Sequence, residues 1–425
     1  MAEQVSAAVS AAHEEKEEER TRQRMLRWES WRGDRLLPPR TMYISPTYHC
    51  NKRCVYCVHS TAVFRDQNYN RDFDGTRLLR LVREGLELGV KEFCIVGGGE
   101  PFLQKDLALS MMREIIEGDA EGAITSNATY LEPSVLRQMV EMGWVSVVMS
   151  LDSHDERTAD FLRGKGTFKG CVAALDALKN LKEEYDTHKP LVALNVVITT
   201  LNYNHVSDLI RFAADHGVWD MWLTPVTTHN KEMEYLKLNT RQTAEFQDII
   251  RECIPLWHEL GLNNTNLREM LDMRFTSETG NMIPVLLSGK EEAGRPRPQG
   301  VVRRLIQRIP LAVQGMVPWT SPHEVPQVQE TVSGHTTLPL CFEPWSTIVV
   351  HPDGSLNPCQ HNSNATSIGN RSLRDAWYND AFLESMRVAH ATRQLPDFCR
   401  KCCSAVVAQR VHEQAAIRVL QETGD

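Results

Sequence analysis

The stretch that decides the fold is TMYISPTYHCNKRCVYC at residues 41–57. Its first part, residues 41–46, is a short apolar run typical of a strand. The part that follows carries Cys50, Cys54 and Cys57, at spacings of four and three residues. Three thiols in a loop directly after a strand can wrap around one iron–sulfur cube, because thiolates are the usual ligands of such clusters. Three thiolates leave one of four irons open for chemistry, whereas a zinc site or a fourth, distant thiolate would be structural.

Downstream of this loop, apolar runs alternate with amphipathic stretches as far as about Pro225. Short strands buried on both faces and separated by helices indicate βαβ units and a parallel sheet. Counting the strand before Cys50, the pattern predicts six units. We expect the later strands at residues 93–96, 123–125, 145–151, 191–200 and 221–225, and helices near 107–117, 133–142, 169–185 and 205–216.

The segments before and after this series do not show its alternation of apolar runs and amphipathic stretches. Residues 14–31 predict a charged helix that we expect to be solvated and to pack loosely on the main domain. Two amphipathic helices, near 240–260 and 266–276, precede a connection rich in Pro and Arg, and a strand pair at 347–350 and 355–357 follows it. The predicted segments are an N-terminal helical arm (1–40), the βα series (41–226), an inserted connecting region (227–337) and a cysteine-bearing module with a C-terminal helix (338–425).

Composition excludes several classes of protein. The 425 residues hold 47 Lys and Arg against 55 Asp and Glu, a net charge of −8 that gives no broad footprint for nucleic acid. We see no apolar window long enough for a transmembrane segment and no apolar signal stretch near the N-terminus, and so expect a cytoplasmic protein. In that reducing compartment, the 11 cysteines are expected to be metal ligands or buried apolar residues, not disulfides.

Further motifs follow successive strands. These are the run from Val96 through Gly97, Gly98 and Gly99 to Glu100, then Thr125-Ser126-Asn127, then Ser150-Leu151-Asp152, and finally Arg163-Gly164. Together with the cysteine spacing, they resemble the radical S-adenosylmethionine (radical SAM) superfamily from about residue 41 to residue 403. The resemblance implies a partial (β/α)6, TIM-like barrel with SAM across the C-terminal ends of its strands. It also implies that a 4Fe-4S cluster on Cys50, Cys54 and Cys57 cleaves SAM to a 5′-deoxyadenosyl radical.

The resemblance assigns SAM contacts to individual residues. Glu100 and the glycines before it would bind the amino group of SAM, and the guanidinium fork of Arg163 matches its carboxylate. Tyr56 is similar to the aromatic residue beside adenine, with a core role as the alternative, and Ala128 stands where glycine is common. The expected SAM-binding residues are Tyr56, Gly98, Gly99, Glu100, Ser126, Asn127, Ser150, Asp152 and Arg163.

A second group of cysteines lies in the last quarter of the chain. Cys341, Cys359, Cys399 and Cys402 supply four thiolates, enough to close a cube or to hold a tetrahedral zinc ion. Cys403 is an alternative to Cys402. The pattern resembles the shortened SPASM module called a twitch domain, which implies one auxiliary 4Fe-4S cluster. The remaining cysteines, Cys94, Cys171 and Cys253, are interpreted as small buried hydrophobes.

These features lead to an expected function. A second redox centre beside the substrate can accept an electron after hydrogen abstraction, which gives dehydrogenation, with dehydration as the redox-neutral outcome. Residues 1–40 are too short and polar for a winged peptide-recognition domain, so we expect a small polar substrate such as an aminocyclitol, sugar or nucleoside. A one-electron donor such as flavodoxin or ferredoxin would be the partner. The alternatives are a maturase of a ribosomal peptide or protein, and a non-catalytic iron–sulfur or zinc protein. We assign no catalytic residue and name Trp222, His229, Trp319 and His361 as candidate liners of the substrate pocket.

Overall fold

The protein is described by a computed structural model, which covers residue 19 and residues 22–33, 35–228, 231–262, 266–271, 273–275, 282–284, 341–360, 365–392, 394–396 and 399. The chain divides into two units. The first holds residues 1–16, 40–282 and the short segment 350–354, and the second holds residues 17–39, 283–349 and 355–425. Among the helices within these described ranges, none has the length and apolar character needed to cross a membrane.

A parallel sheet of six strands forms the centre of the first unit. The strands neighbour one another in chain order, and each pairs in parallel with the next. This confirms the predicted βα series. The strands are β1 (Thr41–Ile44), β2 (Glu92–Ile95), β3 (Glu121–Ser126), β4 (Ser146–Ser150), β5 (Leu191–Ile198) and β6 (Asp220–Pro225).

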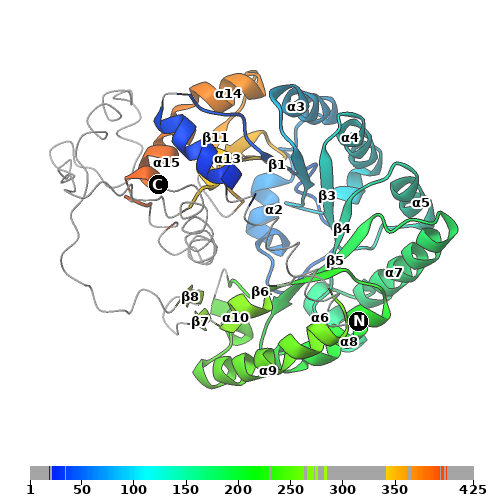
Figure 1. Ribbon diagram of the computed structural model, residues 1–425. Helices are drawn as coiled ribbons and strands as arrows, with labels where there is room; N and C mark the ends of the chain where they lie inside the picture. Colours follow the sequence, from blue (N-terminus) through cyan, green and yellow to red (C-terminus); the bar gives the residue numbers. More distant parts are fainter. Residues whose placement is uncertain are drawn as a thin grey trace, which may run out of the picture. The chain divides into compact units, whose positions relative to one another are not determined.

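Helices cover the outer side of this sheet, where α3, α4, α5, α7 and α8 follow one another around it (Figure 1). Helix α3 was not expected from the sequence. Asp74 caps its N-terminus and Gly89, at a φ of 103°, ends it. The helices of this unit are α2 (Ala62–Asn68), α3 (Gly75–Leu88), α4 (Lys105–Glu117), α5 (Pro133–Glu141), α6 (Glu156–Arg163), α7 (Thr167–Glu184), α8 (Val206–Asp215), α9 (Thr240–Glu259) and α10 (Leu267–Leu271), with short 3-10 turns at Val58–Ser60, Pro101–Gln104, Tyr203–His205 and Lys231–Leu236.

The strands are fully buried on one face only. Along β5, Val192, Leu194, Val196 and Ile198 are at most 2% exposed, and the residues between them are partly exposed. Because side chains alternate between the two faces of a strand, the buried set faces the covering helices and Asn195 faces the opposite, inner side. The expectation of strands buried on both faces was therefore wrong, and the inner side is where a ligand can lie.

Asp220, the first residue of β6, is a carboxylic acid whose pKa is changed by burial. Burial raises the pKa of its carboxyl from 3.8 to about 7, against the lowering effect of the Met221 N–H that it accepts. The folded state therefore holds a proton that the unfolded state releases, so stability is lost as pH rises from about 4 to 7. We expect Asp220→Asn to raise the free energy of unfolding of the metal-free protein by about 1–3 kcal/mol at pH 8 and by little at pH 4. Urea unfolding at both pH values measures this, and an equal effect at the two would contradict it.

The region after β6 is described in part. The helix predicted near 240–260 is confirmed as α9. The one predicted near 266–276 is shorter, since α10 ends at Leu271 and is followed by β7 (Met273–Phe275), which pairs with β8 (Met282–Pro284). Of the candidate pocket liners, Trp222 is described and 48% exposed, whereas His229, Trp319 and His361 lie outside the described residues.

The second unit contains the strand pair expected from the sequence. Its elements are a helix over residues 22–32, α13 (Glu343–Ser346), β9 (Thr347–Val350, whose last residue falls in the first unit), β10 (Ser355–Asn357), β11 (Thr366–Ser367), α14 (Leu373–Asn379) and α15 (Ala381–Ala391). β10 neighbours β9 and pairs antiparallel with β11.

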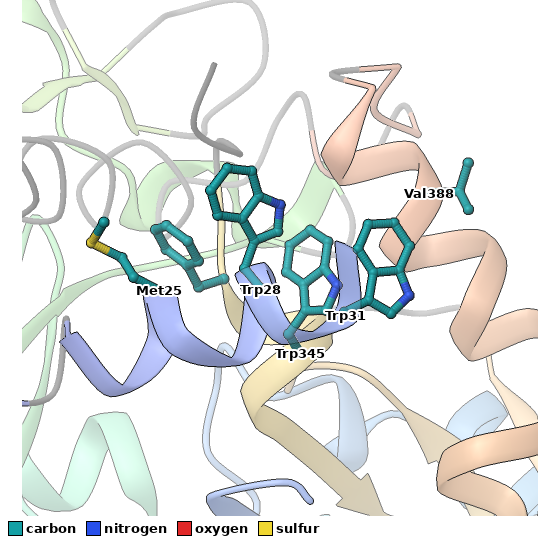
Figure 2. Close-up of a cluster of buried hydrophobic side chains, with 6 residues drawn as sticks. Met25, Trp28, Trp31, Trp345 and Val388 are labelled. Atoms are coloured by element: carbon teal, nitrogen blue, oxygen red, sulfur yellow. The ribbon is translucent and has the colours of Figure 1, made fainter. Parts of the chain in front are cut away.

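The helix over residues 22–32 is part of a hydrophobic core. Met25, Trp28 and Trp31 are at most 6% exposed and pack with Trp345 and with side chains from α15 (Figure 2). The rings of Trp31 and Trp345 meet edge to face at 5.5 Å. The expectation of a loosely packed, solvated arm was therefore wrong for this helix, because its charged residues surround an apolar face.

Candidate active site

The segment that carries the first three cysteines, residues 47–57, is called here the cysteine loop. Two hydrogen bonds to the Asp72 carboxylate hold its start: the Thr47 hydroxyl donates at 2.5 Å and the Tyr48 N–H at 3.0 Å. The N–H of Gly99 donates to the Thr47 carbonyl at 2.9 Å. The loop is thus fixed against the turn that follows β2.

The glycines after β2 allow this close approach. A Cβ on Gly99 would lie 1.8 Å from the His49 carbonyl oxygen, and one on Gly98 would lie 2.8 Å from the ring of Tyr48. Any side chain at Gly99 would push the turn away from the cysteine loop. The glycines therefore bring Glu100 next to the loop, where its N–H donates to the His49 carbonyl at 2.8 Å.

The Glu100 carboxylate is buried, and hydrogen bonds use part of its capacity as an acceptor. It accepts from the Ser126 hydroxyl and the Asn127 N–H, both at 2.8 Å, and from the Phe102 N–H at 3.2 Å. Burial raises the pKa of Glu100, and these three hydrogen bonds act in the opposite direction. An ionised carboxylate can accept about four hydrogen bonds. One position is therefore left, which suits an ammonium donor such as the amino group of SAM.

Asn127 connects this carboxylate to the cysteine loop. Its Nδ2 donates to Asn51 Oδ1 at 2.8 Å and lies 3.9 Å from Cys50 Sγ. The next residue, Ala128, has a φ of 63°, in the left-handed region that favours glycine. A glycine would adopt this backbone conformation without the strain that Ala128 carries.

Arg163 is paired with Asp152 in the interior. Its Nε and Nη2 donate to the two oxygens of Asp152 at 2.8 and 2.7 Å, and the arginine is 7% exposed. The Tyr56 hydroxyl and the Val197 N–H donate to the same carboxylate at 2.6 and 2.8 Å. Nη1 of Arg163 has no hydrogen bond to any described residue, so a contact with the carboxylate of SAM stays a prediction for that nitrogen. Ser150, at the end of β4, is buried.

The three thiols of the cysteine loop lie close enough to influence one another electrostatically. Burial raises the pKa of Cys54 to about 12 and also raises that of Cys50, so uptake of iron must release protons. Within the described part of the chain, no three His, Cys, Asp or Glu side chains converge as ligands of a single metal ion. A cube imposes a different geometry, because each thiolate binds its own iron, and the donor set of three cysteines fits it.

A buried acceptor faces the same region from β5. Oδ1 of Asn195 is buried and has no hydrogen-bond partner among the described residues. Asn195 is in register with Ser150 on one side and Trp222 on the other, and its backbone carbonyl accepts from Arg163 Nη2 at 3.3 Å. A buried polar atom of this kind calls for a partner, and a donor on a bound ligand would supply it. No motif in the sequence points to Asn195.

Asp353 is a second residue that sequence reasoning missed. It lies in the turn between β9 and β10, where aspartate is a common residue. Its carboxylate accepts from the Tyr48 hydroxyl at 3.2 Å and forms an ion pair with Arg71 at 2.7 Å. Gly354 follows at a φ of 75°, where a Cβ would lie 2.1 Å from the Phe73 ring. The turn is thereby attached to Tyr48 of the cysteine loop and to residues 71–73, which follow that loop.

The second cysteine group is described in part. Cys341 and Cys399 are buried, Cys359 is partly buried after β10, and Cys402 and Cys403 lie outside the described residues. Cys399 packs with Met386 and Leu395 in an apolar cluster. Nε2 of His390 lies 3.5 Å from Cys399 Sγ.

Comparison with known protein families identifies both parts of the chain. A model of the radical SAM superfamily matches residues 44–213, and a model of the SPASM iron–sulfur cluster-binding domain matches residues 341–403. The chain therefore carries a radical SAM domain over residues 44–213 and a SPASM domain over residues 341–403. These two domains imply SAM and 4Fe-4S clusters as cofactors.

Several curated relatives match about 40% of the chain. They are a tungsten-containing aldehyde ferredoxin oxidoreductase cofactor-modifying protein of Pyrococcus furiosus (28% identical, 42% of this chain and 49% of that protein), a GTP 3′,8-cyclase of Nautilia profundicola (30%, 41% and 52%) and mycofactocin maturase MftC of Mycolicibacterium smegmatis (28%, 40% and 41%). The match thus spans about half the length of these relatives.

Solved structures share the fold over more of the chain. Streptococcus suis SuiB bound to precursor peptide SuiA is 16% identical, with a TM-score of 0.54, and covers 84% of this chain and 69% of that one. Native anSMEcpe with bound AdoMet and Cp18Cys peptide is 14% identical, with a TM-score of 0.54, and covers 90% of this chain and 96% of that one. At these identities the likeness establishes the fold alone.

Proposed function

We propose that this chain reductively cleaves SAM at an open iron held by Cys50, Cys54 and Cys57. The observation that carries the proposal is the convergence of Glu100, Asn127 and the Asp152–Arg163 pair on the cysteine loop from the carboxyl ends of separate strands. When bound, the cluster and SAM supply a 5′-deoxyadenosyl radical that takes a hydrogen atom from the substrate. In this arrangement Glu100 holds the amino group of SAM and Tyr56 and Arg163 close the site around it.

We infer that the substrate is a peptide segment of a precursor or protein. The expectation of a small polar molecule rested on the absence of a recognition domain within residues 1–40. The peptide-bound anSMEcpe chain weakens that reasoning, because 96% of it aligns with this chain. A peptide can therefore bind a radical SAM protein that has little beyond the shared parts. The SuiB complex with SuiA and the maturase MftC favour the same class of substrate.

A small-molecule substrate is the second candidate. It is favoured by the 30% identity to a GTP 3′,8-cyclase over 178 residues. That match covers 41% of this chain, whereas the likeness to the peptide-bound structure covers 90%. We therefore rank the peptide first.

Substrate-dependent SAM cleavage distinguishes the two candidates. Under anaerobic conditions with a chemical reductant, 5′-deoxyadenosine would be measured with a pool of synthetic peptides, with a pool of sugars and aminocyclitols, and with GTP. Stimulation by peptides, with deuterium passing from labelled peptide into 5′-deoxyadenosine, supports the proposal. Stimulation confined to GTP or to the sugars would replace it with the second candidate. Zinc in place of iron after anaerobic purification would identify a non-catalytic protein.

Cys399→Ala tests the separate role of the auxiliary cluster. We expect this variant to cleave SAM with reductant alone at a rate near that of the native protein, because the cysteine loop is intact. Iron content should fall by about half, since one of two four-iron cubes loses a ligand. Formation of modified substrate should stop. A variant that keeps all its iron would show that Cys399 is not a ligand.

A further inference from the structure

His390 is a buried histidine in the second unit that no role above explains. It lies on α15 and is 3% exposed. Its Nε2 lies 3.5 Å from Cys399 Sγ, and its Nδ1 is buried without a hydrogen-bond partner among the described residues. The ring meets Trp345 edge to face, with centroids 6.5 Å apart. Buried polar atoms without a partner are rare in folded proteins.

Which ring nitrogen of His390 carries the proton determines which of its buried polar atoms has a hydrogen-bond partner. A buried imidazole is neutral and carries one N–H. With the proton on Nδ1, a buried donor would be left unpaired, which is less tolerable than an unpaired acceptor. With the proton on Nε2, the donor meets the sulfur of Cys399 and only a lone pair on Nδ1 lacks a partner.

The protonation state of the sulfur decides how strong the hydrogen bond of the second tautomer is. A thiol can also donate its proton to Nε2, but that returns the ring proton to Nδ1. A thiol sulfur accepts the Nε2–H only weakly, whereas a thiolate, which is the state of cysteine as a metal ligand, accepts it strongly. The Nε2–H···S hydrogen bond is therefore strongest when Cys399 holds a metal.

We propose that His390 donates an N–H···S hydrogen bond to the Cys399 thiolate of the auxiliary cluster and raises the reduction potential of that cluster. The proposal rests on the assignment of Cys399 as a ligand. Reduction adds negative charge to the sulfurs, so a donor stabilises the reduced cluster more than the oxidised one. His390 is thus a positioning residue that acts through Cys399.

The test uses the full chain with Cys50, Cys54 and Cys57 replaced by alanine, so that the auxiliary cluster is measured alone. Its midpoint potential would be determined by EPR-monitored titration. We expect His390→Phe to shift the potential to more negative values, and His390→Gln, which keeps an N–H donor, to restore part of the shift. Met386→Leu is the matched control, because it alters the packing against Cys399 and removes no donor. An unshifted potential in His390→Phe would overturn the proposal.

A spectroscopic measurement covers the case in which His390→Phe loses its cluster. In protein labelled with 15N-histidine, pulsed EPR of the reduced cluster should detect a weak nitrogen coupling that disappears in His390→Gln. A strong coupling, as from a direct ligand, or no coupling at all would contradict the hydrogen bond. Cys399→Ala in the same background separates the two assignments: retained iron refutes the ligand, whereas lost iron with an unshifted His390→Phe refutes only the hydrogen bond.

Discussion

Replacing Cys57 with alanine is expected to reduce 5′-deoxyadenosine formation from SAM to the background of the reductant alone. With two thiolates remaining, the loop cannot hold a cube that presents one open iron in a defined position. The loss should exceed the roughly 10–100-fold effect typical of residues that only support metal ligands. Anaerobic reconstitution, iron analysis and chromatographic measurement of 5′-deoxyadenosine would check it.

Cys253→Ala is the matched control for this prediction. Cys253 is 1% exposed within α9 and is not among the residues of the cysteine loop. Its replacement should lower stability modestly and leave SAM cleavage near the native level. If Cys57→Ala still forms 5′-deoxyadenosine above background, the open iron is not held by the cysteine loop.

The strand and helix order of the barrel could be predicted because it depends on local patterns. Short apolar runs separated by amphipathic stretches indicate βα units in any one sequence. Which face of a strand stays accessible depends on closure of the sheet, which is not a local property. Hence the six strands were located correctly, whereas the accessible inner face with Asn195 was not foreseen.

The buried apolar face of the helix over residues 22–32 was not predicted, because charged residues dominate this part of the sequence. Met25, Trp28 and Trp31 recur every three residues, a helical spacing that predicts one buried side. The charged residues before and between them favoured a solvated helix instead. The partners of this face, Phe342 and Trp345, lie more than 300 positions later in the sequence, so the sequence alone could not identify them.

The sequence motifs predicted which residues belong to the site, but they did not predict which of these residues contact one another. The motifs named Asp152 and Arg163 together, but their direct ion pair depends on the return of α6 to the end of β4. His390 had no signal at all, since a single histidine in an amphipathic helix is usually a packing residue. Contacts between distant segments decide both cases.

Asp152→Ala is expected to lower the free energy of unfolding by about 3–5 kcal/mol, because it leaves the Arg163 guanidinium buried without a counter-charge. Four donors, two on Arg163 and one each on Tyr56 and Val197, lose their acceptor together. Urea unfolding of the metal-free protein measures the cost. Asp152→Ala combined with Arg163→Met should cost less than the sum of the single changes, because residues in direct contact are coupled.

The exposed ion pair of Arg137 and Glu184 provides the control for this prediction. Its N–O distance is 2.8 Å, close to the 2.7 Å between Arg163 and Asp152, but its side chains are 45% and 53% exposed against 8% and 0%. Glu184→Ala should therefore cost about 0–1 kcal/mol, since water screens the pair and solvates the remaining arginine. Similar pair geometry with different burial isolates the desolvation of Arg163 as the cause. If Asp152→Ala and Glu184→Ala lowered the free energy of unfolding equally, Arg163 would have to be solvated. The closed arrangement of Asp152, Arg163 and Tyr56 around the SAM site would then be wrong.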